Sequence, residues 1–290
     1  MNSDAQAQPL PSITAQNLAS AVTEGFVDNN GVKIHYATMG QGPLIILIHG
    51  HPDFWYGWRN QMPALARRYQ VVAIDQRGIN LSDQPAGVEN YTVQKQVGDV
   101  AAVIKAFKRE KAIIIGHDTG AAVAWSFASA LPQMTERVVS LNLPFPTALA
   151  KARAENPAQQ VASRTSYGLA QPGSAAGITR EQLLGILGPL NLADRQVYTE
   201  AFGRTNLETF VGYFQANLSS TTAPVLPKIK VPALVIHGMK DPFVLTASHD
   251  RNWEYTEDSL TTVMLPNAGH FVQTDAPKEV NRILLEWLSH

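Results

Sequence analysis

Three residues of this sequence have the types and the order needed for nucleophilic catalysis. Asp118 stands at the centre of the turn sequence GHDTG, directly after the apolar run AIII. Asp241 lies in GMKDPF after a later apolar run, and His270 lies in NAGHF after the run LTTVML. A carboxylate can act as a nucleophile, and a histidine that a second carboxylate orients can act as a general base. We therefore predict a triad with Asp118 as the nucleophile, His270 as the base and Asp241 as the orienting acid.

An aspartate in place of a serine changes the chemistry that this turn can support. A serine that attacks a saturated carbon would form an ether, which an enzyme does not readily hydrolyse, whereas a carboxylate forms an ester. Asp118 therefore favours attack on an alkyl carbon. Water activated by His270 would then attack the carbonyl carbon of the ester and restore the carboxylate of Asp118.

The triad residues follow short, β-branched apolar runs that alternate with helical patterns. Continuous apolar runs of this kind are typical of parallel strands that are covered on both faces. We predict a doubly wound α/β sheet, preceded by a hairpin with an Asn-Gly turn, whose site lies at the carboxyl ends of the strands. The predicted strands lie in residues 44–50, 71–78, 112–118, 137–144 and 232–238, and the predicted helices in residues 57–68, 94–108, 119–131 and 277–289.

The alternation stops between residues 144 and 230. This segment contains helical patterns such as REQLLGIL, LADRQVYTEAFGR and LETFVGYFQANL, and it contains no strand-like run. We interpret it as a helical cap that is inserted into the α/β unit and lies over the functional edge of the sheet. The predicted division of the chain is a flexible N-terminal segment at 1–23, an α/β core at 24–144 and 222–290, and the cap at 145–221.

The composition favours a small-molecule partner over a macromolecular one. The chain has 290 residues, 45% of them hydrophobic, and a formal net charge of −1, which is typical of one globular unit. The chain has no block of Lys and Arg of the kind that indicates nucleic-acid binding. It also has no apolar run that approaches the roughly 20 residues needed to span a bilayer. Without cysteine there is no disulfide or catalytic thiol, and the eight histidines lack metal-ligand spacing, so no metal is expected.

The first 20 residues are polar and lack the basic start and apolar region of a signal peptide. They are compatible with a cytoplasmic protein, and also with a periplasmic or secreted chain from which a signal has been removed. The compartment therefore stays open, and so does the oligomeric state.

The turn GHDTG matches the G-x-nucleophile-x-G elbow, in which glycines permit a sharp turn between a strand and a helix. With HGHPDFWYGWRNQMPALA, AIDQRGINLSDQP, GMKDPFV and NAGHFVQTDAP, the chain resembles the α/β-hydrolase family. The resemblance is strongest to the aspartate-nucleophile branch of epoxide hydrolases, which is related to haloalkane and haloacetate dehalogenases. It extends from about residue 24 to the C-terminus and implies an α/β-hydrolase fold, an aspartyl-ester intermediate and no cofactor.

The resemblance also implies roles for residues around the nucleophile. The backbone N–H groups of His51 and Thr119 would hold the oxyanion that forms when water attacks the ester. Pro52 of the HGxP segment is expected to be cis. Pro52, Phe54, Trp55 and Phe214 are candidates for the substrate pocket, although packing in the core accounts equally well for the aromatic residues.

Two positions depart from the pattern of epoxide hydrolases. Some relatives place the orienting acid after the preceding strand, where this chain has Asn142, and an amide cannot balance an imidazolium charge. In the cap, relatives use two tyrosines, or a histidine and a tyrosine, to protonate the leaving oxygen. Tyr213 is the natural candidate for one of these acids, although a shift of one residue would place Phe214 there. Tyr167 is the candidate for the other.

The position that the motif AQPG assigns to this second acid holds Thr165, which is too weak an acid to serve. Halide-binding relatives carry Asn after HG and Trp after the nucleophile, where this chain has His51 and Thr119, and HDTGAAVAW contains no arginine. We therefore predict hydrolysis of an epoxide to a vicinal diol. The alternatives are a haloalkane or haloacid dehalogenase with the same triad and, as a minor one, a hydrolase-fold protein that binds a ligand without turnover. The expected partner is an apolar epoxide or halide.

Overall fold

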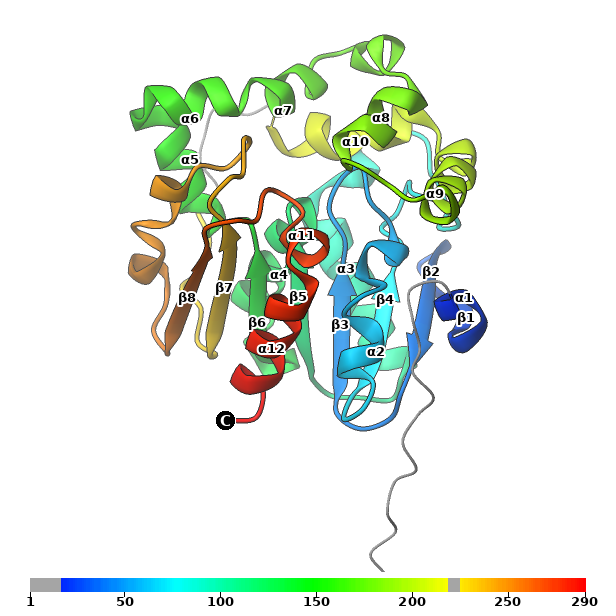
Figure 1. Ribbon diagram of the computed structural model, residues 1–290, viewed down its shortest axis with the longest axis vertical. Helices are drawn as coiled ribbons and strands as arrows, with labels where there is room; N and C mark the ends of the chain where they lie inside the picture. The colour runs from blue at the N-terminus through cyan, green and yellow to red at the C-terminus, as the bar shows by residue number, and fades with distance from the viewer. Residues whose placement is uncertain (1–16, 219–224) are drawn as a thin grey trace, which may run out of the picture.

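A computed structural model describes residues 17–218 and 225–290 of the chain. Its centre is an eight-stranded sheet in the order β1-β2-β4-β3-β5-β6-β7-β8 (Figure 1). Strands β1 and β2 form an antiparallel hairpin around Asn30 and Gly31, both with positive φ, as the Asn-Gly turn predicts. The pair β2–β4 is also antiparallel, and all other pairs of neighbours are parallel. The predicted doubly wound α/β sheet is therefore confirmed.

The strands and helices have the following bounds. The strands are β1 (Thr23–Asn29), β2 (Val32–Met39), β3 (Leu44–Ile48), β4 (Gln70–Ile74), β5 (Ala112–His117), β6 (Thr135–Leu141), β7 (Ala233–Gly238) and β8 (Leu260–Leu265). The helices outside the cap are α1 (Leu18–Ala21), α2 (Met62–Leu65), α3 (Val93–Ala106), α4 (Thr119–Ala130), α11 (Val272–Asp275) and α12 (Pro277–Trp287). Short 3-10 helices are η2 (Trp55–Trp58), η3 (Val88–Tyr91), η4 (Pro132–Met134), η5 (Ser174–Gly177), η6 (Thr246–His249) and η7 (Asn252–Tyr255).

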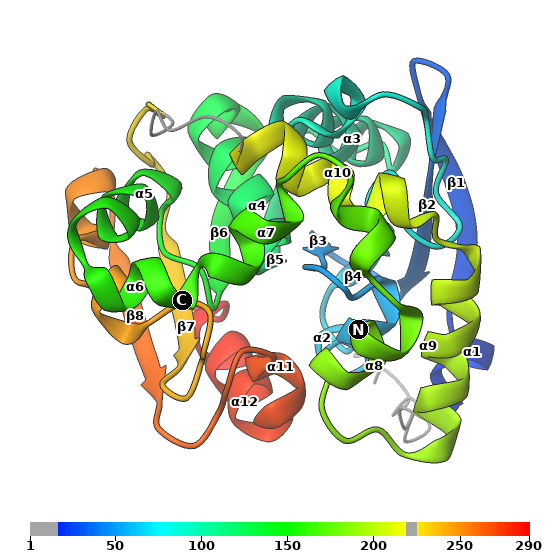
Figure 2. The same ribbon diagram turned by 90° about the horizontal axis from the view of Figure 1, so that it is seen from above.

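Apolar side chains on both faces of the sheet hold the helices in place. Successive residues of a strand point to opposite faces, so a continuous apolar run supplies two cores at once. In β3, Ile45 and Leu47 belong to the apolar cluster that includes α2 and α12. Ile46 and Ile48 belong to the cluster on the other face, which includes α3 and α4 (Figure 2).

A second group of helices covers the carboxyl ends of the strands (Figure 1). We name them the cap helices: α5 (Pro146–Glu155), α6 (Pro157–Ala162), α7 (Arg164–Leu169), α8 (Arg180–Ile186), α9 (Leu192–Arg204) and α10 (Leu207–Leu218). All of them lie between β6 and β7 in the sequence. The predicted cap ends at 221, but residues 219–224 lie outside the described part of the chain.

The predicted flexible segment at 1–23 lies mostly outside the described residues, which begin at Asn17. Within its described part, Leu18 is fully buried in α1 and β1 begins at Thr23. No helix in the described ranges has the length and apolar character needed to cross a bilayer.

The predicted continuous helix at 57–68 is wrong. The structure has η2 (Trp55–Trp58) followed by a separate short helix α2, which begins at Met62. Pro63 occupies the first turn of α2. Proline has no N–H to donate to a preceding turn and its ring collides with the carbonyl four residues earlier, so a helix cannot pass through this position undisturbed.

Candidate active site

Asp118 lies at a sharp turn between β5 and α4. Its φ of 49° and ψ of −122° are sterically costly for a residue with a side chain. Neighbouring glycines make room for the turn: a Cβ on Gly116 or Gly120 would collide with a backbone carbonyl, and one on Gly50 would lie 2.5 Å from Cβ of Asp118. The turn therefore projects the Asp118 carboxylate beyond the carboxyl end of β5, toward the cap helices.

His270 connects the two predicted carboxylates of the triad. Its Nδ1 lies 2.8 Å from Oδ2 of Asp241, and its Nε2 lies 3.6 Å from Oδ2 of Asp118. Because a carboxylate only accepts hydrogen bonds, Nδ1 must carry the proton. The unprotonated Nε2 of the neutral ring then faces Asp118. The structure thus brings together Asp118, His270 and Asp241.

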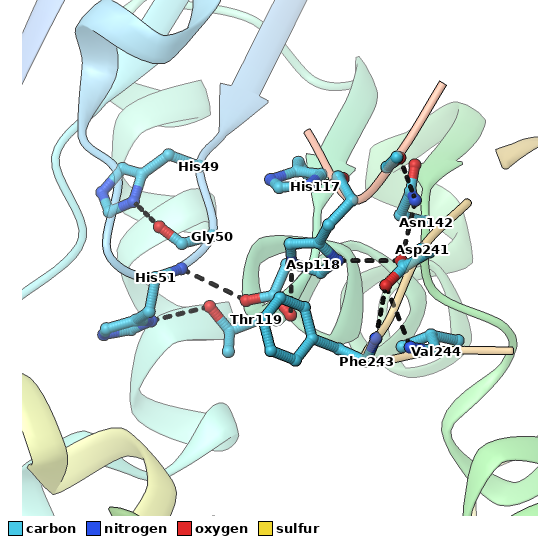
Figure 3. A network of polar contacts seen from close by, with 12 residues as sticks. His49, Gly50, His51, His117, Asp118, Thr119, Asn142, Asp241, Phe243 and Val244 are labelled. Atoms are coloured by element: carbon cyan, nitrogen blue, oxygen red, sulfur yellow. Dashed lines mark hydrogen bonds and ion pairs between the residues drawn. The ribbon is translucent and has the colours of Figure 1, made fainter. Parts of the chain in front are cut away.

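The carboxylate of Asp241 is buried and strongly hydrogen-bonded (Figure 3). Its Oδ1 accepts from the backbone N–H of Phe243 at 2.8 Å and of Val244 at 3.1 Å. Burial alone would raise the pKa of Asp241, but the charge of His270 and the hydrogen bonds from His270, Asn142 and Phe243 lower the pKa to about 2. Asp241 is therefore ionised near neutral pH.

Asn142, in the position where some relatives carry the acid, supports Asp241. Its Nδ2 donates to Oδ2 of Asp241 at 2.8 Å and to the carbonyl of Gly269 at 3.0 Å. The residue has a positive φ of 58°, which asparagine tolerates better than most residues. The amide of Asn142 thus connects Asp241 to Gly269, the residue that precedes His270.

The surroundings of His270 favour its charged form. Burial would lower the pKa of His270, but the charge of Asp241, the hydrogen bond between them and the charge of Asp118 together raise the pKa above 6.5. His117 steadies the same segment, because its Nε2 lies 2.7 Å from the carbonyl oxygen of His270, which can only accept.

Of the two predicted oxyanion donors, His51 contacts the Asp118 carboxylate in the described structure and Thr119 does not. The backbone N–H of His51 donates to Oδ1 of Asp118 at 3.2 Å. The backbone N–H of Thr119 makes no hydrogen bond to this carboxylate within the described chain, so its role stays a prediction for the intermediate. The peptide bond between His51 and Pro52 is cis, as expected.

The ring of His51 fills the space between the nucleophile and the cap. Its Nδ1 lies 2.8 Å from the hydroxyl of Thr119, and its ring lies 5.1 to 5.4 Å from the rings of Phe210, Tyr213 and Phe214. Burial lowers the pKa of His51 to about 3, so the ring is neutral near pH 7. An apolar, aromatic wall therefore faces the nucleophile.

Of the two predicted cap acids, Tyr213 lies closer to the site. It is buried in α10, and its hydroxyl has no hydrogen-bond partner among the described residues. Burial and the charge of Asp118 raise the pKa of Tyr213, while the charge of Arg153 lowers it. Tyr167 in α7 is 39% exposed, with its ring 5.5 Å from the guanidinium of Arg153. Thr165 is exposed.

The remaining pocket candidates lie around the HGxP segment. Phe54 and Trp55 are buried; the ring of Phe54 packs edge-on at 5.2 Å against Tyr198 of α9, and the N–H of Trp55 donates to Asp75 at 2.9 Å. Phe214 packs against Tyr213. These contacts suit both a pocket wall and core packing, so the predicted pocket role is still untested.

Sequence reasoning missed a buried polar network that joins the HGxP segment to the cap. The hydroxyl of Tyr198 donates to Asp53 at 2.9 Å, and Arg59 pairs with Asp194 at 3.3 Å. The charges of Asp53, Arg59 and Asp194 gave no periodic signal, and their pairing becomes visible only when α9 is placed over the segment.

Sequence reasoning also missed Arg153, whose single charge in α5 gave no signal. No group of three or more His, Cys, Asp or Glu side chains in the described ranges could hold a metal ion.

Comparison with known proteins assigns the chain to a family. The profile of the alpha/beta hydrolase fold family matches residues 43–277, so this chain belongs to the α/β-hydrolase family. The predicted fold and family are confirmed. The AB hydrolase superfamily protein YfhM of Bacillus subtilis is 33% identical over 279 residues, which cover 91% of this chain and 97% of that protein.

Within that family the chain resembles epoxide hydrolases. Epoxide hydrolase A of Mycobacterium tuberculosis is 30% identical and is matched over 93% of this chain and 98% of that protein. The crystal structure of an epoxide hydrolase from Bacillus megaterium in complex with an inhibitor superposes with a TM-score of 0.86 at 26% identity, over 92% of this chain and 100% of that one. The chain is thus an epoxide-hydrolase-like member of the family, as the sequence motifs predicted.

Proposed function

We propose that this protein hydrolyses an epoxide to a vicinal diol through an ester of Asp118. The observation that carries the proposal is the carboxylate at the elbow, with Nε2 of His270 at 3.6 Å and the His51 N–H at 3.2 Å. A carboxylate nucleophile suits attack on an alkyl carbon, and the epoxide hydrolases among the relatives support that chemistry.

In the first step, an oxygen of Asp118 attacks a ring carbon and the carbon–oxygen bond of the epoxide breaks. Tyr213 gives its proton to the leaving oxygen, and Tyr167 is the candidate for a second donor. In the products of this step, Asp118 is a neutral alkyl ester and Tyr213 is a phenolate. The charge of Arg153 stabilises that phenolate, since the same charge lowers the pKa of Tyr213.

In the second step, Nε2 of His270 takes a proton from water while the water oxygen bonds to the carbonyl carbon of Asp118. The N–H groups of His51 and Thr119 hold the resulting oxyanion. When the intermediate collapses, the diol oxygen leaves and takes the proton from His270. The restored carboxyl group of Asp118 returns a proton to Tyr213 through the solvent, so the cycle closes without a cofactor.

The isotopic label of the first turnover tests this mechanism. A panel of aryl and alkyl epoxides is incubated with excess enzyme in ¹⁸O-water. The enzyme is then digested, and the mass of the peptide that contains Asp118 is measured by mass spectrometry. We expect solvent oxygen in Asp118 and unlabelled oxygen in the first diol, with no diol from Asp118→Asn. No diol from any epoxide, or a first diol that carries the solvent label, would contradict the proposal.

Dehalogenation by the same triad is the competing function. It requires N–H donors for a halide, and here Nδ1 of His51 is already occupied by the hydroxyl of Thr119. Halide release from haloalkanes and haloacids, measured beside the epoxide panel, separates the two activities. Thermal stabilisation by an epoxide without any product would point to a binding protein instead. We also propose the division into core and cap at residues 145 and 221.

A further inference from the structure

Arg153 is a half-buried cation in the cap that has no carboxylate partner within the described ranges. It lies in α5, where its Nε donates to the hydroxyl of Ser163 at 3.2 Å. Its guanidinium lies over the ring of Tyr167. The two terminal nitrogens, Nη1 and Nη2, have no hydrogen-bond partner in the part of the chain that the structure describes. One edge of the guanidinium, with two nearly parallel N–H groups, is therefore open.

The surroundings of Arg153 place this cation at the active site. Tyr167 belongs to α7, and the end of α7 packs on Tyr213 and Phe214 of α10 through Leu169 and Ala170. From above, α7 crosses the carboxyl ends of the central strands beside α10 (Figure 2). The charges that act on Arg153 are those of Tyr167, Tyr213 and Asp118. Arg153 thus faces the space between the cap and the nucleophile.

An arginine in this environment is costly unless an anion joins it. Burial removes water from the guanidinium and lowers the pKa of Arg153. An Nη1–Nη2 edge matches the two oxygens of one carboxylate, and such bidentate pairs are among the strongest hydrogen bonds in proteins. The leaving oxygen of an epoxide needs a proton, and arginine does not give one up. The chemistry of Arg153 therefore suits an anion that persists through the reaction.

We propose that Arg153 binds a carboxylate group of the substrate, so that the preferred substrates are epoxides that also carry a carboxylate. This inference rests on the proposed function and replaces its purely apolar substrate by an epoxy acid. The carboxylate of Asp118 repels a second carboxylate, and Arg153 offsets that repulsion. Once Asp118 is esterified and neutral, the pair of Arg153 and the substrate carboxylate still holds the intermediate in the site.

Ligand binding tests this site without turnover. The probes are 3-phenylpropanoate and its neutral analogue 3-phenylpropanamide, measured by titration calorimetry at pH 7. We expect the wild-type protein to bind the carboxylate about tenfold or more tightly than the amide, and Arg153→Met to remove this preference. Arg164→Met, which removes an exposed arginine of α7, is the matched control and should keep it. Equal binding of both probes by the wild-type protein would overturn the proposal.

Turnover of a matched pair of epoxides gives the second test. For 3-phenylglycidate and 3-phenylglycidamide, we expect kcat/KM of the wild-type enzyme to favour the acid. In Arg153→Met we expect kcat/KM to fall for both substrates, because the Tyr213 phenolate loses a stabilising charge, but to fall much further for the acid, so that the preference disappears. An equal loss on both substrates would assign Arg153 to the leaving oxygen and overturn the inference. If neither epoxide gives diol although the carboxylate probe still binds through Arg153, the proposed function fails and the anion site stands.

Discussion

The amide of Asn142 and the Nδ1–H of His270 share one acceptor, Oδ2 of Asp241, each at 2.8 Å. A carboxylate oxygen that accepts two donors is fixed in direction, and so is the imidazole that it orients. The residue that stands in the alternative acid position therefore orients Asp241, the proposed acid.

Asn142→Asp should raise the pKa of His270, since a second carboxylate next to Asp241 favours the imidazolium. The base form of His270 is lost as the pH falls through its pKa, so the rate of hydrolysis of the intermediate should require a higher pH than in the wild-type enzyme. The measurement is the single-turnover rate of diol release between pH 5 and 9. Asn142→Ala is the control, in which the hydrogen bond is lost without a new charge. An unchanged pH profile in Asn142→Asp would contradict the role given to Asn142.

His270→Gln should trap the alkyl ester of Asp118. The variant keeps a polar side chain but has no base for the attacking water, a loss of about 10²- to 10⁴-fold. Intact mass spectrometry after mixing with an epoxide should show the protein plus one equivalent of epoxide. Asp118→Asn in the His270→Gln background should show no adduct. Rapid diol release by His270→Gln would remove His270 from the mechanism.

Tyr213→Phe should slow ring opening without weakening the fold. The side chain of Tyr213 is buried and its hydroxyl has no partner in the described structure, so its removal leaves no hydrogen bond unmade. We expect the rate of ester formation to fall about 10²-fold and the thermal midpoint to stay the same or rise. Tyr167→Phe, measured in parallel, shows whether the exposed tyrosine contributes. A normal rate of ester formation in Tyr213→Phe would assign the proton to another group.

Gly50→Ala should damage the site far more than a glycine substitution in the cap. The new Cβ would lie 2.5 Å from Cβ of Asp118, so the elbow or the HGxP segment must move. We expect loss of activity and a drop of about 1–3 kcal/mol in the free energy of unfolding. Gly185→Ala is the control, because its Cβ in α8 meets nothing within 4 Å and alanine favours helix by about 0.4–1 kcal/mol. Full activity in Gly50→Ala would contradict the described geometry.

Acid should destabilise the protein below about pH 6. Burial lowers the pKa of His117 to about 4 and that of His249 to about 3, and His249 contacts the buried His237 at 3.1 Å. Unfolded histidines bind protons below about pH 6.5, while these stay neutral in the fold, so stability falls with decreasing pH. Each contributes up to about 1.4 kcal/mol per pH unit. His270, whose pKa is raised, acts in the opposite direction.

Urea unfolding at pH 7, 6 and 5 measures this dependence. His249→Gln should flatten the pH dependence, because the substituted residue no longer titrates. Equal stability at pH 7 and pH 5 in the wild-type protein would show that the buried histidines are not neutral in the fold.

The sequence was informative where local chemistry decides the structure. The apolar runs that became β3 to β7 are buried on both faces, as is typical of parallel strands in a covered sheet. The turn at Asp118 could be predicted because Gly116 and Gly120 flank it, and glycines at these positions permit a sharp turn between a strand and a helix. The proximity of His270 and Asp241 to Asp118 could be predicted because each follows a strand, and parallel strands end at the same edge of the sheet.

The sequence was less informative where contacts between distant segments decide the structure. The helix predicted at 57–68 is not continuous, because α2 begins only at Met62, next to Pro63. Phe54, which precedes this segment, packs against Tyr198 of the cap, a contact that the sequence alone does not show. The sequence could not decide which cap residues act as acids, because a shift of one residue along α10 replaces Tyr213 by Phe214 at the expected position. Arg153 gave no signal in the sequence. What distinguishes it is that no carboxylate in the described residues pairs with its guanidinium, and this depends on the fold and not on its neighbours in the sequence.

The cap is attached to the sheet at two adjacent strands. Val138 of β6 pairs with Ala233 of the parallel strand β7, so the chain leaves the sheet at the carboxyl end of β6 and re-enters it at the amino end of the adjacent strand. Every member of the proposed triad comes from outside that excursion. Mutation, insertion or recombination can therefore remodel the cap without disturbing the strand order, which makes the choice of substrate evolvable independently of the catalytic apparatus.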